Sequence, residues 1–219
     1  MRINWNYIKA FVLLVLVVFL YAFSLTKNNE RNLEDVKVNF IGENNLYITE
    51  SMVNKLLIQN ETDVTSVRKD ALDLNELEFA LNSNDMIKSA EVYLTVNGEV
   101  IADVEQRNPI ARVSTNASYY IDDEGEFMPL STNHTAHVPL VTGNIEKNKL
   151  ENVYQIAKRV YEDEFLRKHI VEIHQNNEGE LKLKMRVYNF EVLLGNLQNL
   201  DSKINNLKAF YQKAKKDNT

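Results

Sequence analysis

The chain of 219 residues contains no cysteine, only three prolines, six glycines and a single tryptophan. Without cysteine the protein has no disulfide, no thiolate zinc site and no cysteine nucleophile. So few glycines and prolines exclude a collagen-like or linker-like tract. The glycines are scattered and form neither a G-x-G-x-x-G nor a Walker A pattern, so no nucleotide-binding loop is indicated.

Positive charge is also scarce. The 25 Lys and Arg residues are outnumbered by 31 Asp and Glu residues, which gives a net charge of −6 at pH 7. A protein that neutralises nucleic-acid phosphates needs a basic face, so we expect no nucleic-acid partner. Hydrophobic residues at 44% and charged residues at 26% are typical of a folded chain.

One long apolar run stands at the start of the chain. From Ala10 to Phe23 no side chain is charged or strongly polar. A helix over residues 8–25 would be about 27 Å long, close to the hydrocarbon thickness of a bilayer. Trp5 and Tyr7 precede the run, where aromatic rings favour the membrane interface. We predict a transmembrane helix at residues 10–25.

A cleaved signal peptide is the alternative interpretation of this run. It is less favoured because Ala22-Phe23-Ser24 is a poor small-x-small cleavage site among large residues. No second apolar run of this length follows, so we expect a single-pass membrane protein. The short tail, residues 1–9, carries no folded domain, and we place it in the cytoplasm. A polar tether, residues 26–34, would then lead to exported domains, which in a bacterium would lie in the periplasm or on the outer surface.

The next region predicts a small α+β module over residues 35–109. Its elements follow the order strand, helix, helix, strand, strand, and the last two strands are joined by Asn97-Gly98, a type I′ hairpin signal. A capping box from Asp73 to Glu76 marks the start of the second helix. Two helices covering one face of a small sheet would bury both apolar stripes.

Residues 110–219 predict a second, β-rich α+β domain. Short alternating strands are mixed with helices expected at residues 150–165 and 201–213. All three prolines fall between residues 109 and 139, which suggests edge strands and loops in that stretch rather than a central sheet.

No constellation of catalytic or metal-binding residues is evident. The four histidines lack a convergent third ligand at metal-site spacing, and the acidic turn after Asp122 lacks the remainder of a calcium loop. No G-x-S-x-G elbow or S-x-x-K motif supplies a nucleophile. We therefore expect no enzyme activity, no metal, no cofactor and no small-molecule substrate.

An ordered set of motifs resembles the FtsQ/DivIB family of bacterial cell-division proteins. The family's Glu-x-Arg-x-Pro-h-Ala pattern, in which h is apolar, matches the residues from Glu105 to Ala111. Further landmarks, all in the family's order and covering most of residues 36–211, are Tyr120–Gly125 with Met128-Pro129-Leu130, Val138-Pro139-Leu140 with Gly143, and Leu194-Gly195 followed by Lys203 and Leu207.

The resemblance implies a fold and a function. The first module would be a POTRA module, which has the same β-α-α-β-β order. The protein would be a non-catalytic scaffold of the division machinery in the inner (cytoplasmic) membrane, with its folded domains in the periplasm. It would recruit and hold single-span coiled-coil proteins similar to FtsB and FtsL at the septum. The alternative is another envelope interaction protein that uses a POTRA-like module for secretion or a chaperone-like role.

Sheet edges bind partners by strand addition. The candidate partner-binding residues therefore lie in and near the late strand that the resemblance indicates. They are Phe190, Val192, Leu194 and Lys203. In this family a further strand usually follows the last helix and supplies the partner edge, whereas here the sequence stops without one. Either the sequence is truncated or the strand near Phe190 takes that role, and the sequence leaves both open.

Glu105, Arg107 and Pro109 are expected to form an inter-module corner. In this interpretation Arg107 pairs with Glu105, and Pro109 ends the strand because proline cannot donate to a ladder.

Overall fold

The computed structural model describes residues 5–29, 35–42, 45–58, 72–115, 117–147, 149–187 and 190–217. The chain divides into two compact units, Met1–Ile41 with Thr49–Glu105 and Gly42–Ile48 with Gln106–Thr219. The start of the expected tail, residues 1–4, and most of the expected tether, residues 30–34, lie outside the described residues.

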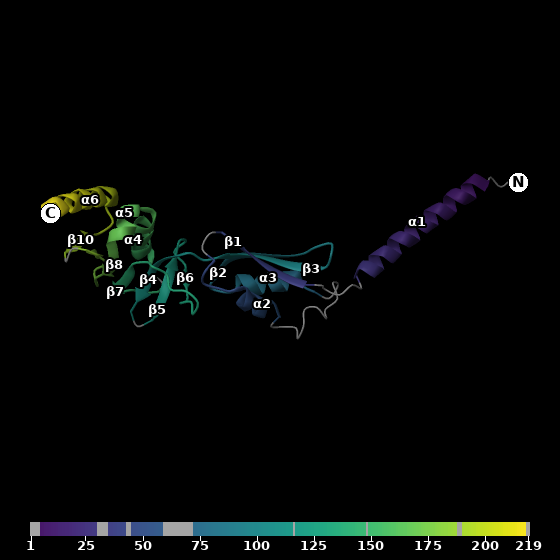
Figure 1. Cartoon of the computed structure of the whole chain (residues 1–219), viewed down its shortest axis with the longest axis horizontal. Coiled ribbons are helices and arrows are strands. Elements are labelled where there is room, and N and C mark those ends of the chain that lie inside the picture. The colour runs from purple at the N-terminus through teal and green to yellow at the C-terminus, as the bar shows by residue number, and fades with distance from the viewer. Residues whose placement is uncertain are drawn as a thin grey trace. The chain divides into compact units, whose positions relative to one another are not determined.

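Helix α1, Trp5–Asn29, contains the apolar run and extends beyond it at both ends (Figure 1). Within it, Trp5–Ser24 is long and apolar enough to cross a membrane, and none of that window is buried by other parts of the protein. In the described part of the chain no other helix meets the same criterion. Length and composition therefore agree with the predicted membrane span.

The first folded module is a three-stranded sheet with two helices on one face (Figure 1). The strand order is β1-β3-β2, and β1 runs parallel to β3 with Asp35 opposite Glu99. Its elements are β1 Asp35–Ile41, α2 Glu50–Ile58, α3 Leu74–Asn82, β2 Ile87–Leu94 and β3 Glu99–Gln106. The expected order of elements is confirmed.

The core of this module follows the alternation seen in the sequence. Val100, Ala102 and Val104 on β3 are at most 1% exposed, and Leu81 on α3 is fully buried. The Asp73 carboxylate caps α3 by accepting hydrogen bonds from the N–H groups of Asn75 and Glu76. This cap satisfies donors that have no partner within the helix.

The turn between β2 and β3 differs from the type expected. A type I′ turn needs positive φ at both central residues, but here Gly98 alone among the turn residues has a positive φ, of 97°. Gly98 N–H donates to Thr95 O at 3.1 Å, and Thr95 N–H donates to Glu99 O at 2.9 Å. The position of the hairpin is confirmed, but the type I′ assignment is wrong.

The second unit is built on a seven-stranded mixed sheet in the order β10-β9-β8-β7-β4-β5-β6, counted over the described residues. Its strands are β4 Pro109–Ser114, β5 Ser118–Asp122, β6 Phe127–Met128, β7 Leu140–Gly143, β8 Ile170–Gln175, β9 Leu181–Met185 and β10 Glu191–Gly195. Its helices are α4 Glu151–Glu162, α5 Glu164–His169 and α6 Leu200–Asp217. One buried cluster joins strands β4, β5 and β7–β10 to all three helices.

Two expectations for this unit need correction. Pro109 does not end a strand but begins β4, which lies inside the sheet between β7 and β5. Proline is tolerated there because the first residue of a strand can do without an N–H donor. The helix expected at residues 150–165 is two helices, because the chain is extended at Asp163, which caps α5.

The boundary between the units lies after Glu105, four residues before the expected one. The Gln106 side chain explains this position, because its Oε1 accepts hydrogen bonds from the N–H groups of Tyr47 and Ile48, while its Nε2 donates to Ile48 O at 2.9 Å. Gln106 is only 6% exposed, so these bonds satisfy a buried amide. Residues 42–48 thereby belong to the second unit.

Candidate functional site

Strand β10 lies at one end of the seven-stranded sheet and has β9 as its neighbour on one side. Glu191, Val192 and Leu193 pair in antiparallel register with Lys184, Leu183 and Lys182. Within the described ranges, no strand pairs with the other side of β10. Such an edge presents backbone N–H and C=O groups to which another chain can add a strand.

The side chains of β10 alternate between the core and solvent. Leu194 is 4% exposed and packs into the buried cluster that includes Ile204 and Leu207 of α6, with the partly buried Val192 packed against it. Leu193 points the other way and is 74% exposed. A partner strand on this edge would therefore meet an apolar side chain as well as backbone groups.

A groove of about 480 Å³ runs between β10 and α6. We call it the β10 groove; its lining includes Phe190, Val192, Leu194, Lys203, Leu207 and Phe210. The rings of Phe190 and Phe210 meet edge to face with centroids 5.4 Å apart, and Phe210 is 57% exposed. The structure thus brings together all four residues selected from the sequence.

Two further residues that line the groove, Leu193 and Phe210, are not predicted as partner-binding residues from the sequence. Phe210 follows buried Leu207 at helical spacing, yet more than half of Phe210 faces solvent. Leu193 sits between two core-facing residues in an apolar run, and periodicity does not say which face of such a run is covered. No local signal marks either residue as exposed.

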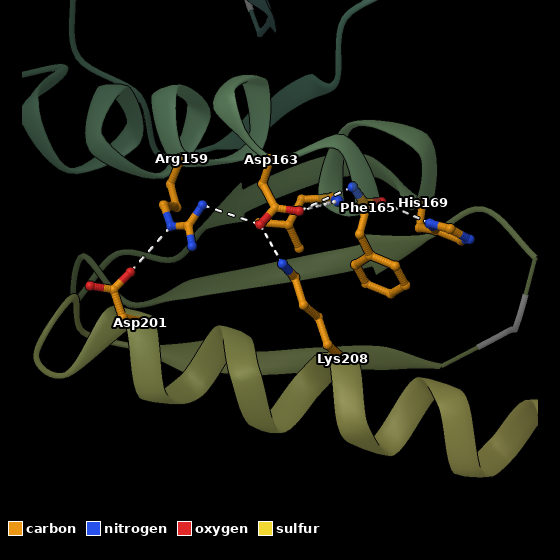
Figure 2. A network of polar contacts seen from close by, with 7 residues as sticks. Arg159, Asp163, Phe165, His169, Asp201 and Lys208 are labelled. Carbon is orange, nitrogen blue, oxygen red and sulfur yellow. Dashed lines mark hydrogen bonds and ion pairs between the residues drawn. The ribbon is translucent and has the colours of Figure 1, made fainter.

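Helix α6 is fixed to the preceding helices by the carboxylate of Asp163 (Figure 2). Oδ2 of Asp163 accepts hydrogen bonds from Lys208 Nζ at 2.5 Å and from Arg159 Nη1 at 3.2 Å. Oδ1 accepts from the N–H groups of Phe165 and Leu166 and caps α5. One side chain therefore both starts α5 and positions the wall of the β10 groove.

The charges around Asp163 change its proton affinity. Burial alone would raise the pKa of the Asp163 carboxyl, but the hydrogen bond from Lys208, the Leu166 N–H and the charges of Lys208 and Arg159 together hold that pKa below its ordinary value. Arg159 also reaches Asp201 of α6, with 3.3 Å between Nε and Oδ1 (Figure 2). Asp163 therefore stays ionised to a lower pH than an ordinary aspartate does.

An aromatic cluster supports the same helix. The rings of Phe165 and His169 stack at 4.4 Å, and Tyr211 meets both edge-on at 5.1 and 4.6 Å. Nδ1 of His169 lies 2.7 Å from the Phe165 carbonyl oxygen (Figure 2). Aromatic packing of this kind adds stabilisation beyond the buried area.

The expected ion pair between Arg107 and Glu105 is wrong. Arg107 Nη1 instead donates to Asp122 Oδ2 at 2.6 Å, while Glu105 accepts from Ser89 Oγ and lies 3.9 Å from Lys88 Nζ. The physical reason is burial: Asp122 is completely inaccessible and needs a charged partner, whereas Glu105 is partly solvated.

Asp122 also holds the turn between β5 and β6. Its Oδ1 accepts the N–H groups of Glu124 at 3.0 Å and Glu126 at 2.7 Å. The acidic turn is thus a structural hairpin. No group of three or more His, Asp or Glu side chains that could hold a metal ion occurs in the ranges that the structure describes.

Comparison with known families agrees with this architecture. Residues 34–105 match the model of the POTRA-like domain, and residues 108–219 match the model described as FtsQ/DivIB, C-terminal related. No curated protein matches the chain. A POTRA-like module followed by a β-rich domain defines a protein of modular α+β fold, and its N-terminal apolar helix is consistent with a membrane span.

The chain belongs to the FtsQ/DivIB family. This is a family of non-enzymatic cell-division proteins, and the two matched domains support a scaffold role in division. The single N-terminal apolar helix fits a single-pass division protein of the inner membrane.

Proposed function

We propose that this protein recruits single-span coiled-coil division proteins similar to FtsB and FtsL and holds them at the septum. In this proposal the short N-terminal tail is cytoplasmic and both folded units lie in the periplasm. The domain limits follow the two units, with the POTRA-like module ending near Glu105. Glu105 at the end of the first unit, with Arg107 and Pro109 at the start of the second, are proposed as the segment that links the modules, and Glu105 and Arg107 are held by Ser89 and Asp122 of their own units.

The observation that carries the proposal is the β10 groove. Strand β10 offers an edge, and the adjoining groove offers apolar side chains that a water-soluble monomer seldom leaves exposed together. A partner segment in extended conformation would form main-chain hydrogen bonds with β10 and place alternate side chains against Phe190, Val192 and Phe210.

A pair of matched variants tests this site. Phe210→Glu places a charge in the β10 groove, whereas Phe79→Glu places one on α3, where Phe79 is 73% exposed. Both residues are accessible, so neither variant should unfold the protein. Capture of an epitope-tagged FtsB-like protein by the full-length chain should fall about tenfold or more for Phe210→Glu, because aromatic anchors dominate interfaces. It should not change for Phe79→Glu.

A fluorescent tag on the N-terminal tail tests the role in the cell. A band at mid-cell that appears before constriction supports recruitment at the septum and the N-in orientation together. An even signal around the envelope would contradict recruitment and favour another envelope interaction protein.

Equal capture by the two phenylalanine variants would move the partner site away from β10.

A further inference from the structure

Lys203 is already fully engaged inside the protein. Its ammonium group donates to Leu194 O at 2.9 Å, to Asn196 O at 2.7 Å and to Asn196 Oδ1 at 3.3 Å. An ammonium group has three donors, and three oxygens accept them. The side chain expected to contact a partner therefore also binds the end of β10.

The ladder between β9 and β10 becomes irregular at the same place. Glu191 to Leu193 pair residue for residue with β9, but the register shifts between Leu193 and Gly195, and Leu194 pairs with no residue of β9. Gly195 has a positive φ of 68°. A bulge of this kind bends the strand and leaves one residue without a partner in the ladder.

We propose that Lys203 sets the register of strand addition on β10: a partner segment pairs along Glu191–Leu193 and stops at Leu194, whose carbonyl Lys203 occupies. This inference rests on the proposed function, because it assumes that the partner adds to the β10 edge. The segment that pairs is then only about 10 Å long, three residues at strand spacing. The remaining contacts of the partner lie in the β10 groove, against Phe190 and Phe210.

The register is tested by photo-crosslinking in cells with the full-length chain. A photo-crosslinking amino acid is placed at Leu193, inside the proposed pairing segment, or at exposed Gln198, beyond the bulge. The readout is the yield of adducts with epitope-tagged FtsB-like and FtsL-like proteins of the same cell. The yield at Gln198 should be at least about fivefold below that at Leu193, the factor expected for one net hydrogen bond.

Three variants at lysine positions isolate the role of the ammonium group. Lys203→Met keeps the apolar stem and frees the Leu194 carbonyl, so adducts at Gln198 should rise to the level at Leu193. Lys203→Arg can donate to the same oxygens, so the adduct yield at Gln198 should again be low relative to that at Leu193. Lys213→Met removes the same charge from exposed α6 surface and should leave the wild-type pattern.

The outcomes separate the two proposals. Strong adducts at both positions in the wild type would overturn the register but keep the β10 edge as the partner site. If Lys203→Met and Lys213→Met gave the same ratio of adducts at Leu193 and Gln198, the proposed role of Lys203 in the register would also be overturned. Absence of adducts at Leu193 in every variant would overturn the partner site and the register together. The wild-type comparison stands even if a Lys203 variant folds poorly.

Discussion

The POTRA-like module and the C-terminal end of the chain carry opposite charge. Residues 35–105 contain five Lys and Arg against fourteen Asp and Glu, a net charge of −9. Residues 181–217, which form β9, β10 and α6, contain eight Lys and Arg against three Asp and Glu, a net charge of +5. The overall value of −6 hides this division. Because complementary charge guides association, we expect the two regions to favour partner surfaces of opposite charge.

Their exposed surfaces also differ in how the side chains are satisfied. On the open face of the POTRA-like sheet, Asp103 accepts hydrogen bonds from Asn39 and Tyr93, and Glu99 pairs with Lys37. At β10, apolar Leu193 and Phe210 face solvent beside the strand edge. Polar side chains of the first surface pair with one another, whereas the second leaves apolar area of Leu193 and Phe210 for a partner to cover.

The largest expected effect separates the two units. Val104→Asp places a charge in the centre of the POTRA-like sheet, where Val104 is fully buried. The free energy of unfolding of this module should fall by about 3–5 kcal/mol, because the carboxylate would have no partner there. Hydrogen exchange on the full chain in detergent should show lost protection in β2 and β3 and retained protection in β4 and β8.

Val96→Asp is the matched control, since Val96 lies in the β2–β3 turn and is 90% exposed. It should leave protection in both units unchanged. Simultaneous loss of protection in β8 with Val104→Asp would mean that the two units unfold as one, and the comparison between them would lose its basis.

A smaller effect is expected at the clamp that holds α6. Asp163→Ala removes the helix cap and the bonds from Lys208 and Arg159, and should cost about 2–3 kcal/mol of unfolding free energy in the second unit. Asp163→Asn keeps a side chain that can cap α5 and loses only the charge, so it should cost about half as much. Exchange of the α6 amides reports the change directly.

The pH dependence follows from the lowered pKa of Asp163. A carboxyl whose pKa is depressed in the folded state stabilises the fold above its unfolded pKa, about 3.8, and loses that contribution as the pH falls through the folded pKa. Protection of α6 should therefore decline below about pH 4 in the wild type. A decline of equal size in Asp163→Asn would contradict this explanation.

Much of the fold was predictable because its signals are local. The capping residue Asp73 and the alternation along β3 each lie within a few residues of what they predict. The partner of Arg107 was not predictable, because Asp122 lies fifteen positions away in the sequence and is brought close only by the pairing of β4 with β5. The expectation that Pro109 ends a strand was wrong because proline indicates an edge strand only when it stands inside a strand, whereas Pro109 is the first residue of β4.

The residues of the candidate site were predictable only as far as their signals are local. The residues of β10 form an apolar run that any strand predictor would select, but the strand's position at the end of the sheet depends on the order of all seven strands. The internal role of Lys203 depends on where α6 lies against β10, which no spacing in the sequence encodes. Resemblance to a family located the strand, and only the structure showed which of its groups are engaged.

The smallest expected effect tests the charge of the C-terminal end. Lys213→Gln with Lys216→Gln removes two positive charges from the last turns of α6, at residues that do not line the β10 groove. The association rate with the exported segment of an FtsB-like protein should fall about two- to threefold at low salt, because steering depends on the summed charge of the surface. At about 0.5 M salt, where screening is nearly complete, variant and wild type should associate at the same rate. Lys55→Gln, an exposed change on α2 of the acidic module, is the matched control and should not slow association at either salt concentration. If Lys55→Gln slows association as much as the double variant, the partner responds to the charge of the whole chain, and the basic C-terminal end has no separate role in its capture.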